Sequence, residues 1–160
     1  MFKEGEYIIY KRDLCKITKI EGDYYCLSMI RDESLSIKVP TSNKLNYLRY
    51  PMSKQEAETL ISEIKKIEPI KTTDKLLENT YKELMKTNNP KDLIKIIKTT
   101  YLRNQARLNS KKKVGDKDLT FFNQAENLLY DELSYALNMS YEECKNYIIK
   151  NLTKEKTRSQ

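Results

Sequence analysis

The chain has 160 residues, of which 39% are hydrophobic and 33% are charged. This length suits one ordinary domain or two small ones, and no stretch approaches the roughly 20 apolar residues that a membrane span needs. Histidine is absent, which removes the commonest general base and the commonest metal ligand. We therefore expect no enzyme, no metal, no cofactor, no small-molecule substrate and no membrane partner.

The net charge of +7 is concentrated in one segment. Residues 71–117 hold thirteen Lys and Arg against five Asp and Glu, whereas residues 1–70 hold twelve against eleven and residues 118–160 hold five against seven. A concentrated basic segment favours polyanions through counterion release, although a solvated lysine-rich face has the same composition. The first residues include acids and no apolar segment, so we expect a cytoplasmic protein.

The first fifty residues predict four short strands, at 7–10, 15–20, 24–30 and 35–39. Each is rich in β-branched or aromatic residues, and turn residues separate them, as is typical of an antiparallel meander or small barrel. In the last strand Leu35, Ile37 and Val39 alternate with polar residues. Lys38 is therefore expected to point outward, and Pro40 to end the strand.

From Ser53 the apolar period changes from two to about 3.6. Ser53 and Glu56 form a capping-box pattern, and the helix that they begin is predicted to end near residue 67. Further helices are predicted at 74–86, 90–108, 116–137 and from 140 onward. The sequence thus predicts an α+β protein, with a β domain and trailing helix over residues 1–68, an all-α domain over 69–153 and a frayed tail over 154–160.

The second half of the chain carries its basic residues away from the apolar stripes. On the helix at 90–108 the residues predicted to face outward are Lys91, Lys95, Lys98, Arg103 and Arg107. A polar loop with three consecutive lysines follows, at 111–113, and is the most electropositive point of the chain. We expect phosphate contacts there. Asp116 and Asp118 are explained by the preference of helix N-termini for acids.

The cysteines and several tyrosines are predicted to be packing residues rather than parts of a chemical site. Cys15 and Cys26 can be placed opposite each other on paired strands, but two thiols without further Cys or any His make a poor zinc site. Tyr81, Tyr101 and Tyr147 fall on apolar helical stripes. We predict that these residues lie in the core.

Several segments resemble motifs of the CarD/CdnL family of bacterial transcription regulators. In the N-terminal part, Phe2–Tyr10 resembles the F-x-x-G-D-x-V-V-Y opening of the family, and Leu14–Ile17 its G-V-C-x-V strand; Tyr24–Leu27 is similar to Y-Y-x-L, and Leu35–Asn43 to the strand that ends in [IV]-x-[IV]-P-x-x-N. Leu102–Gln105 and Asp118–Leu133 are similar to motifs of its helical part. Together these segments run from residue 2 to about 150 in the family order.

The resemblance implies a Tudor-like N-terminal domain, a small antiparallel β-barrel, that adds its sheet to the β subunit of bacterial RNA polymerase. The positions that match polymerase-binding residues are Lys38, Lys16, Lys19, Ile37, Pro40 and Asn43. The compact helical domain would contact promoter DNA, through its phosphate backbone and minor groove, at the upstream edge of the bubble. It would modulate open-complex stability without sequence-specific readout, in a cytoplasmic, nucleoid-associated protein.

The DNA contacts implied by the resemblance are Lys75, Lys82, Arg103, Arg107, Lys111, Lys112, Lys113 and Lys117. One departure is that many relatives carry a wedging tryptophan near the position of Thr73, whereas this chain has no tryptophan. The alternative is a free-standing RNA-binding module, in which Tyr24, Tyr25 and Tyr50 stack on bases. The near-neutral charge of the N-terminal part argues against it.

Overall fold

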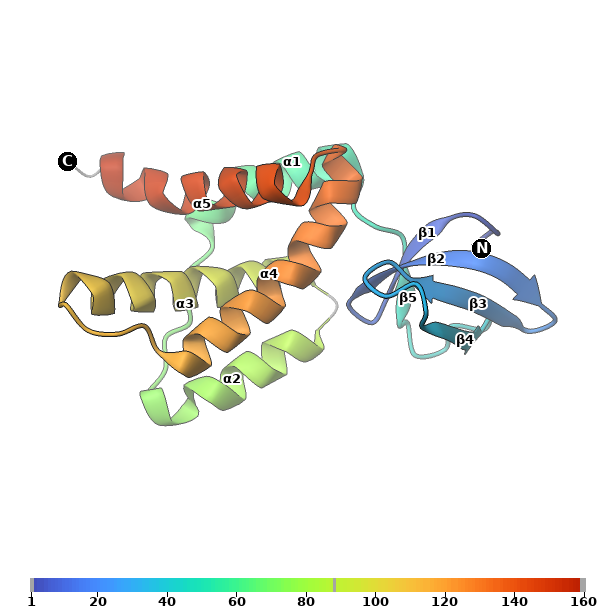
Figure 1. The fold of residues 1–160 in the computed structure, drawn as a ribbon, viewed down its shortest axis with the longest axis horizontal. Helices are drawn as coiled ribbons and strands as arrows, with labels where there is room; N and C mark the ends of the chain where they lie inside the picture. Colours follow the sequence, from blue (N-terminus) through green and yellow to red (C-terminus); the bar gives the residue numbers. More distant parts are fainter. Residues whose placement is uncertain (1, 88, 159–160) are drawn as a thin grey trace. The chain divides into compact units, whose positions relative to one another are not determined.

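In a computed structural model that describes residues 2–87 and 89–158, with side chains up to residue 152, the chain is an α+β protein (Figure 1). A curled antiparallel sheet is followed by helices. The chain divides into two compact units between Met52 and Ser53. This division lies before the predicted boundary at residues 68 and 69, because the helix that begins after Ser53 packs against helices of the second unit.

The first unit, here called the half-barrel unit, is a single curled sheet with the strand order β4-β3-β2-β1-β5. Its strands are β1 (Tyr7–Tyr10), β2 (Asp13–Glu21), β3 (Tyr24–Met29), β4 (Ser36–Pro40) and β5 (Leu48–Arg49). The four predicted strands are confirmed. The sequence did not predict β5, because two residues are too short to show a period. The sheet is open, with β4 and β5 at its edges, rather than a closed barrel.

Alternation along the strands places one set of side chains on the concave face of the half-barrel. The buried members of this core are Ile8, Cys15, Ile17, Tyr25, Leu27, Val39 and Leu48. Cys15 pairs with Met29 in the register, whereas Cys26 pairs with Lys19 and Lys38, so the two thiols are not opposite each other. Burial, together with the Asp13 carboxylate, raises the pKa of the Cys15 thiol to about 12. Both cysteines therefore serve as packing residues.

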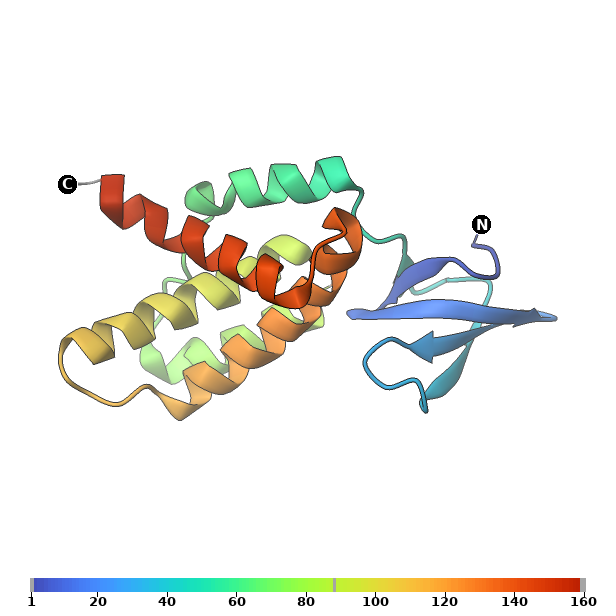
Figure 2. The same ribbon diagram turned by 45° about the horizontal axis from the view of Figure 1, so that its top comes forward.

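The second unit, the helical unit, contains α1 (Lys54–Ser62), the 3-10 turn η1 (Ile64–Lys66), α2 (Asp74–Lys86), α3 (Pro90–Asn109), α4 (Asp116–Leu137) and α5 (Tyr141–Arg158). Helix α4 contacts α1, α2, α3 and α5, and α3 and α4 lie side by side in both views (Figures 1 and 2). The buried apolar residues on α3 and α4 include Ile94, Ile97, Leu129 and Leu133. They form the centre of this unit.

Local signals set the helix boundaries. Ser53 and Glu56 make both hydrogen bonds of the predicted capping box, and Asn89 caps α3 by accepting from Lys91 N at 2.9 Å. The predicted tail is helical through Arg158, and residues 159–160 lie outside the described part of the chain.

Some side chains lie elsewhere than predicted, and Leu35, expected on the buried face of its strand, is 54% exposed just before β4. Lys98 is buried, and its Nζ donates to the carbonyl oxygens of Ile64 at 3.1 Å and Lys65 at 3.3 Å. It therefore satisfies backbone acceptors at the end of η1 rather than facing solvent. Tyr147, predicted to lie in the core, is exposed on α5.

Candidate protein and nucleic-acid interfaces

The convex face of the half-barrel unit carries two lysines that share one carboxylate. Lys19 Nζ lies 2.7 Å from Glu21 Oε1, and Lys38 Nζ lies 3.2 Å from Glu21 Oε2. Hydrogen bonds from both lysines lower the pKa of Glu21. The side chains of Lys19 and Lys38 are more than 60% exposed, and Lys38 stands on the edge strand β4. The predicted outward orientation of Lys38 is confirmed.

The other predicted polymerase contacts are less uniform. Lys16 is exposed, with its Nζ 5.7 Å from the centroid of the Tyr7 ring, and Pro40 is exposed at the end of β4. Ile37 instead packs its half-buried side chain against the concave core. Of the six predicted polymerase contacts, Lys19 and Lys38 are the two that share an ion-pair partner, Glu21.

Asn43 forms a clamp within its own unit. Its Nδ2 donates to the Leu48 carbonyl at 3.1 Å, and its Oδ1 accepts from Leu48 N at 3.0 Å. Its φ of 49° lies in the left-handed region that asparagine tolerates better than most residues. The side chain therefore closes the loop before β5 and holds that strand in place.

We expect Asn43→Ala to lower the free energy of unfolding by about 2 kcal/mol, because it removes two side-chain hydrogen bonds and leaves alanine in a left-handed conformation. Urea denaturation measures the change. Asn43→Gly is the matched control, since glycine loses the same hydrogen bonds without the backbone strain. Equal stability of the alanine variant and the wild type would show that the clamp is unimportant.

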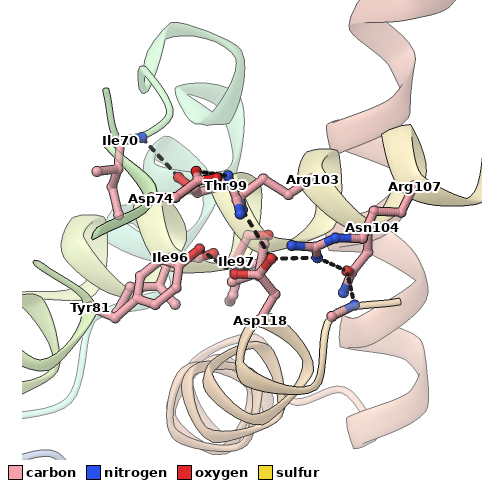
Figure 3. Close-up of polar contacts among 12 residues, drawn as sticks. Ile70, Asp74, Tyr81, Ile96, Ile97, Thr99, Arg103, Asn104, Arg107 and Asp118 are labelled. Carbon is pink, nitrogen blue, oxygen red and sulfur yellow. Dashed lines mark hydrogen bonds and ion pairs between the residues drawn. The ribbon is translucent and has the colours of Figure 1, made fainter. Parts of the chain in front are cut away.

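In the helical unit, the carboxylate of Asp118 gathers three donors from two other helices, and we call this group the Asp118 cluster (Figure 3). Tyr81 from α2 donates its hydroxyl at 2.8 Å. Arg103 Nε donates at 2.9 Å and an Arg107 Nη at 2.6 Å, both from α3. Arg103 also reaches Asp74 at 3.1 Å. The cluster thus ties α2, α3 and the start of α4 together.

The cluster is a buried ion-pair network. The Asp118 side chain is 4% exposed, whereas the two arginines are about 30% exposed. Burial by itself raises the pKa of the Asp118 carboxyl, but hydrogen bonds from Arg103, Arg107 and Tyr81 outweigh it and hold the pKa below its ordinary value. Burial and the hydrogen bond to Asp118 raise the pKa of the Tyr81 hydroxyl. At neutral pH Asp118 is therefore ionised and accepts hydrogen bonds from all three donors.

A hollow of about 410 Å³ opens beside the cluster, between α2, α3 and the start of α4. Four predicted DNA contacts line it: Lys75, Arg103, Arg107 and Lys117. The hollow is also lined by Asp74, Glu78, Asp116 and Asp118, so its charges balance. Glu78 lies 3.2 Å from Lys117 and 4.0 Å from Lys82. The cations here are largely neutralised by their own unit.

The loop of residues 110–115, here called the lysine loop, has the opposite character. Lys111, Lys112 and Lys113 are exposed, and within the described residues no acidic side chain pairs with them. Lys112 N donates to Arg107 O at 2.7 Å and Lys111 N to Leu108 O at 3.0 Å, the two hydrogen bonds of a Schellman motif. The loop is thus an ordered helix end that concentrates uncompensated positive charge.

The sequence pattern did not identify two residues that hold the helical unit together, Asp118 and Asn104. Asp118 was assigned to the helix dipole, and Asn104 was not singled out, although its Oδ1 accepts from both Gly115 N at 2.9 Å and Arg107 at 2.7 Å. The spacing of Arg103 and Arg107 was a usable signal, because two arginines one turn apart can share a carboxylate from a neighbouring helix.

No protein-family model matches the chain, and no curated protein matches it either. Among the described residues, no helix has both the length and the apolar character needed to cross a bilayer. In the same residues, no three Cys, Asp or Glu side chains are grouped as metal ligands would be.

Proposed function

We propose that this chain is a transcription regulator of the CarD/CdnL type, which docks on the β subunit of bacterial RNA polymerase and contacts promoter DNA near the upstream edge of the bubble. The observation that carries the proposal is that one unit has an open sheet edge bearing Lys38 and the other unit has a lysine loop without acidic partners among the described residues. The motif resemblance supplies the partners.

The half-barrel unit is proposed to have a Tudor-like fold and to dock on polymerase. Strand β4 is an edge strand, so its outer backbone groups are suited to strand addition by a partner sheet. Lys38 lies on that edge strand and Lys19 on β2, two strands away, and both exposed side chains contact Glu21 and favour an acidic partner surface. Ile37 packs its side chain into the core beneath β4, and Asn43 holds β5 at the other edge of the sheet, so neither is assigned a contact with the partner.

The helical unit is proposed to contact DNA through phosphates. Arg103 and Arg107 belong to the Asp118 cluster, so we assign the main contacts to the lysine loop and to Lys75, an exposed residue that lines the hollow. Lysine contacts to phosphate carry no base readout. This agrees with regulation that does not depend on a sequence motif.

Thr73 has no wedging role in this proposal. It is the exposed residue that precedes α2, and its side chain is too small to separate stacked bases. DNA contact in this chain therefore depends on phosphate attraction.

The alternative RNA-binding module loses support from the positions of its tyrosines. Tyr25 is 2% exposed, and Tyr50 packs against Phe2 with 4.8 Å between ring centroids while its hydroxyl donates to Glu6. Tyr24 and Tyr50 are each about half exposed. The burial of Tyr25 and the packing of Tyr50 against Phe2 leave a smaller stacking platform than the three predicted rings would make.

Replacing Lys111, Lys112 and Lys113 together with alanine is expected to weaken duplex binding about equally for all sequences. The log–log salt slope should fall by up to about 2.7, at roughly 0.9 per lost phosphate contact. Fluorescence anisotropy over a salt series measures both quantities.

The matched control is the triple alanine variant of Lys54, Lys66 and Lys150, which loses the same charge outside residues 71–117. It should keep most of the slope. A larger loss of slope in this control than in the lysine-loop variant would move the DNA face elsewhere.

A further inference from the structure

Lys111 stands at a backbone position that glycine ordinarily occupies. Its φ is 60°, and it is the residue after the cap of α3 in the Schellman motif. Helix α4 ends with the same kind of left-handed residue, but there the chain uses Asn138, with φ 54°. Asparagine tolerates this conformation better than lysine. A lysine at this position costs stability that glycine or asparagine would not.

The packing of the helical unit does not require a lysine there. The Lys111 side chain is exposed, and no acidic side chain of the described residues pairs with it. A strained residue without a structural role is a signal of function. What the position gains from lysine is a positive charge next to Lys112 and Lys113.

The lysine loop is also held at its far end. Asn104 Oδ1 accepts from Gly115 N at 2.9 Å, and the same oxygen accepts from Arg107, which Asp118 fixes in turn. A Cβ on Gly115 would lie 2.3 Å from the Arg107 guanidinium, so the chain passes directly over that group. The Schellman motif fixes the start of the loop and Asn104 fixes its end.

We propose that the lysine loop is a preformed phosphate-contact element for duplex DNA, in which Lys111 is kept at a strained position for its charge and Asn104 is a positioning residue. The inference rests on the proposed function and deepens it. It assigns a role to the strained backbone at Lys111 and to Asn104, which positions the loop without contacting phosphate itself. A preformed loop binds with less loss of conformational entropy than a flexible one.

The first test is Lys111→Gly, for which stability and binding should change in opposite directions. The melting temperature should rise by about 2–5 °C because the strain is relieved, while duplex affinity falls and the salt slope decreases by about 0.9. Lys112→Ala is the matched control, since it removes one charge without relieving strain. It should lose a similar slope with no rise in melting temperature.

The second test is Asn104→Ala, measured well below its melting temperature. All lysines remain, so the salt slope should stay near that of the wild type while affinity falls at every salt concentration. Asn109→Ala, a change of the same size at an exposed position on α3, should leave both quantities unchanged. A purely structural role for Asn104 would lower the melting temperature and leave the affinity of the folded protein intact.

The outcomes separate this inference from the proposed function. Wild-type protein that binds no duplex DNA at low salt would overturn both. Wild-type binding combined with unchanged affinity in Lys111→Gly, or with no gain in its melting temperature, would overturn the inference alone.

Discussion

Replacing Asp118 with alanine is expected to lower the free energy of unfolding by about 3 kcal/mol. The change removes the acceptor that three donors share: Arg103 keeps Asp74 and Arg107 keeps Asn104, but the hydroxyl of Tyr81, a residue only 1% exposed, loses its partner. It also removes the link that α4 makes to α2 and α3 through this carboxylate. Urea denaturation followed by far-ultraviolet circular dichroism measures the loss.

The control for this variant is Asp116→Ala, in the same first turn of α4 but exposed. Loss of its interaction with the helix dipole should cost less than about 1 kcal/mol. Equal effects of the two substitutions would mean that the Asp118 cluster adds nothing beyond the charge of an ordinary helix N-terminus.

The same variant predicts a pH dependence. Because the folded-state pKa of Asp118 lies below its ordinary value of 3.8, its stabilising effect is present above that pH and is lost as pH falls through the folded-state pKa. The stability difference between wild type and Asp118→Ala should therefore be constant near neutral pH and shrink below about pH 4. A difference that persists unchanged in acid would contradict the ionised cluster.

Lys38→Glu is expected to reduce capture of purified bacterial RNA polymerase by the immobilised 160-residue chain at least about tenfold, since reversing a charge at an interface repels an acidic partner. The substitution also sets a second carboxylate beside Glu21, which Lys38 now contacts at 3.2 Å. Because the lysine side chain is 64% exposed, folding should be unchanged by circular dichroism.

Lys3→Glu is the matched control for Lys38→Glu, because it makes the same charge reversal at an exposed position before β1. Its capture of polymerase should equal that of the wild type. Full capture by the Lys38 variant would remove this residue from the docking face, and no capture by the wild type would contradict the docking proposal as a whole.

Local patterns in the sequence determined most of the secondary structure. Alternation along residues 35–39 was enough to place Lys38 outward, and the Ser53–Glu56 box and the Asn89–Pro90 pair each marked a helix start correctly. These signals depend on residues within one or two turns of each other. They required no knowledge of the rest of the chain, and neither did the concentration of charge between residues 71 and 117.

Only the tertiary structure decided which of those charges are available. Arg103 and Arg107 have the same i, i+4 spacing whether they face DNA phosphates or a carboxylate of their own unit. The structure shows that both pair with Asp118, which lies on another helix. Lys98 satisfies carbonyls more than thirty residues away. The residue type fixes the charge of a side chain, but packing between distant segments determines which partner neutralises that charge. Among the described residues, packing brings no acidic side chain to the lysine loop, so the loop remains positive.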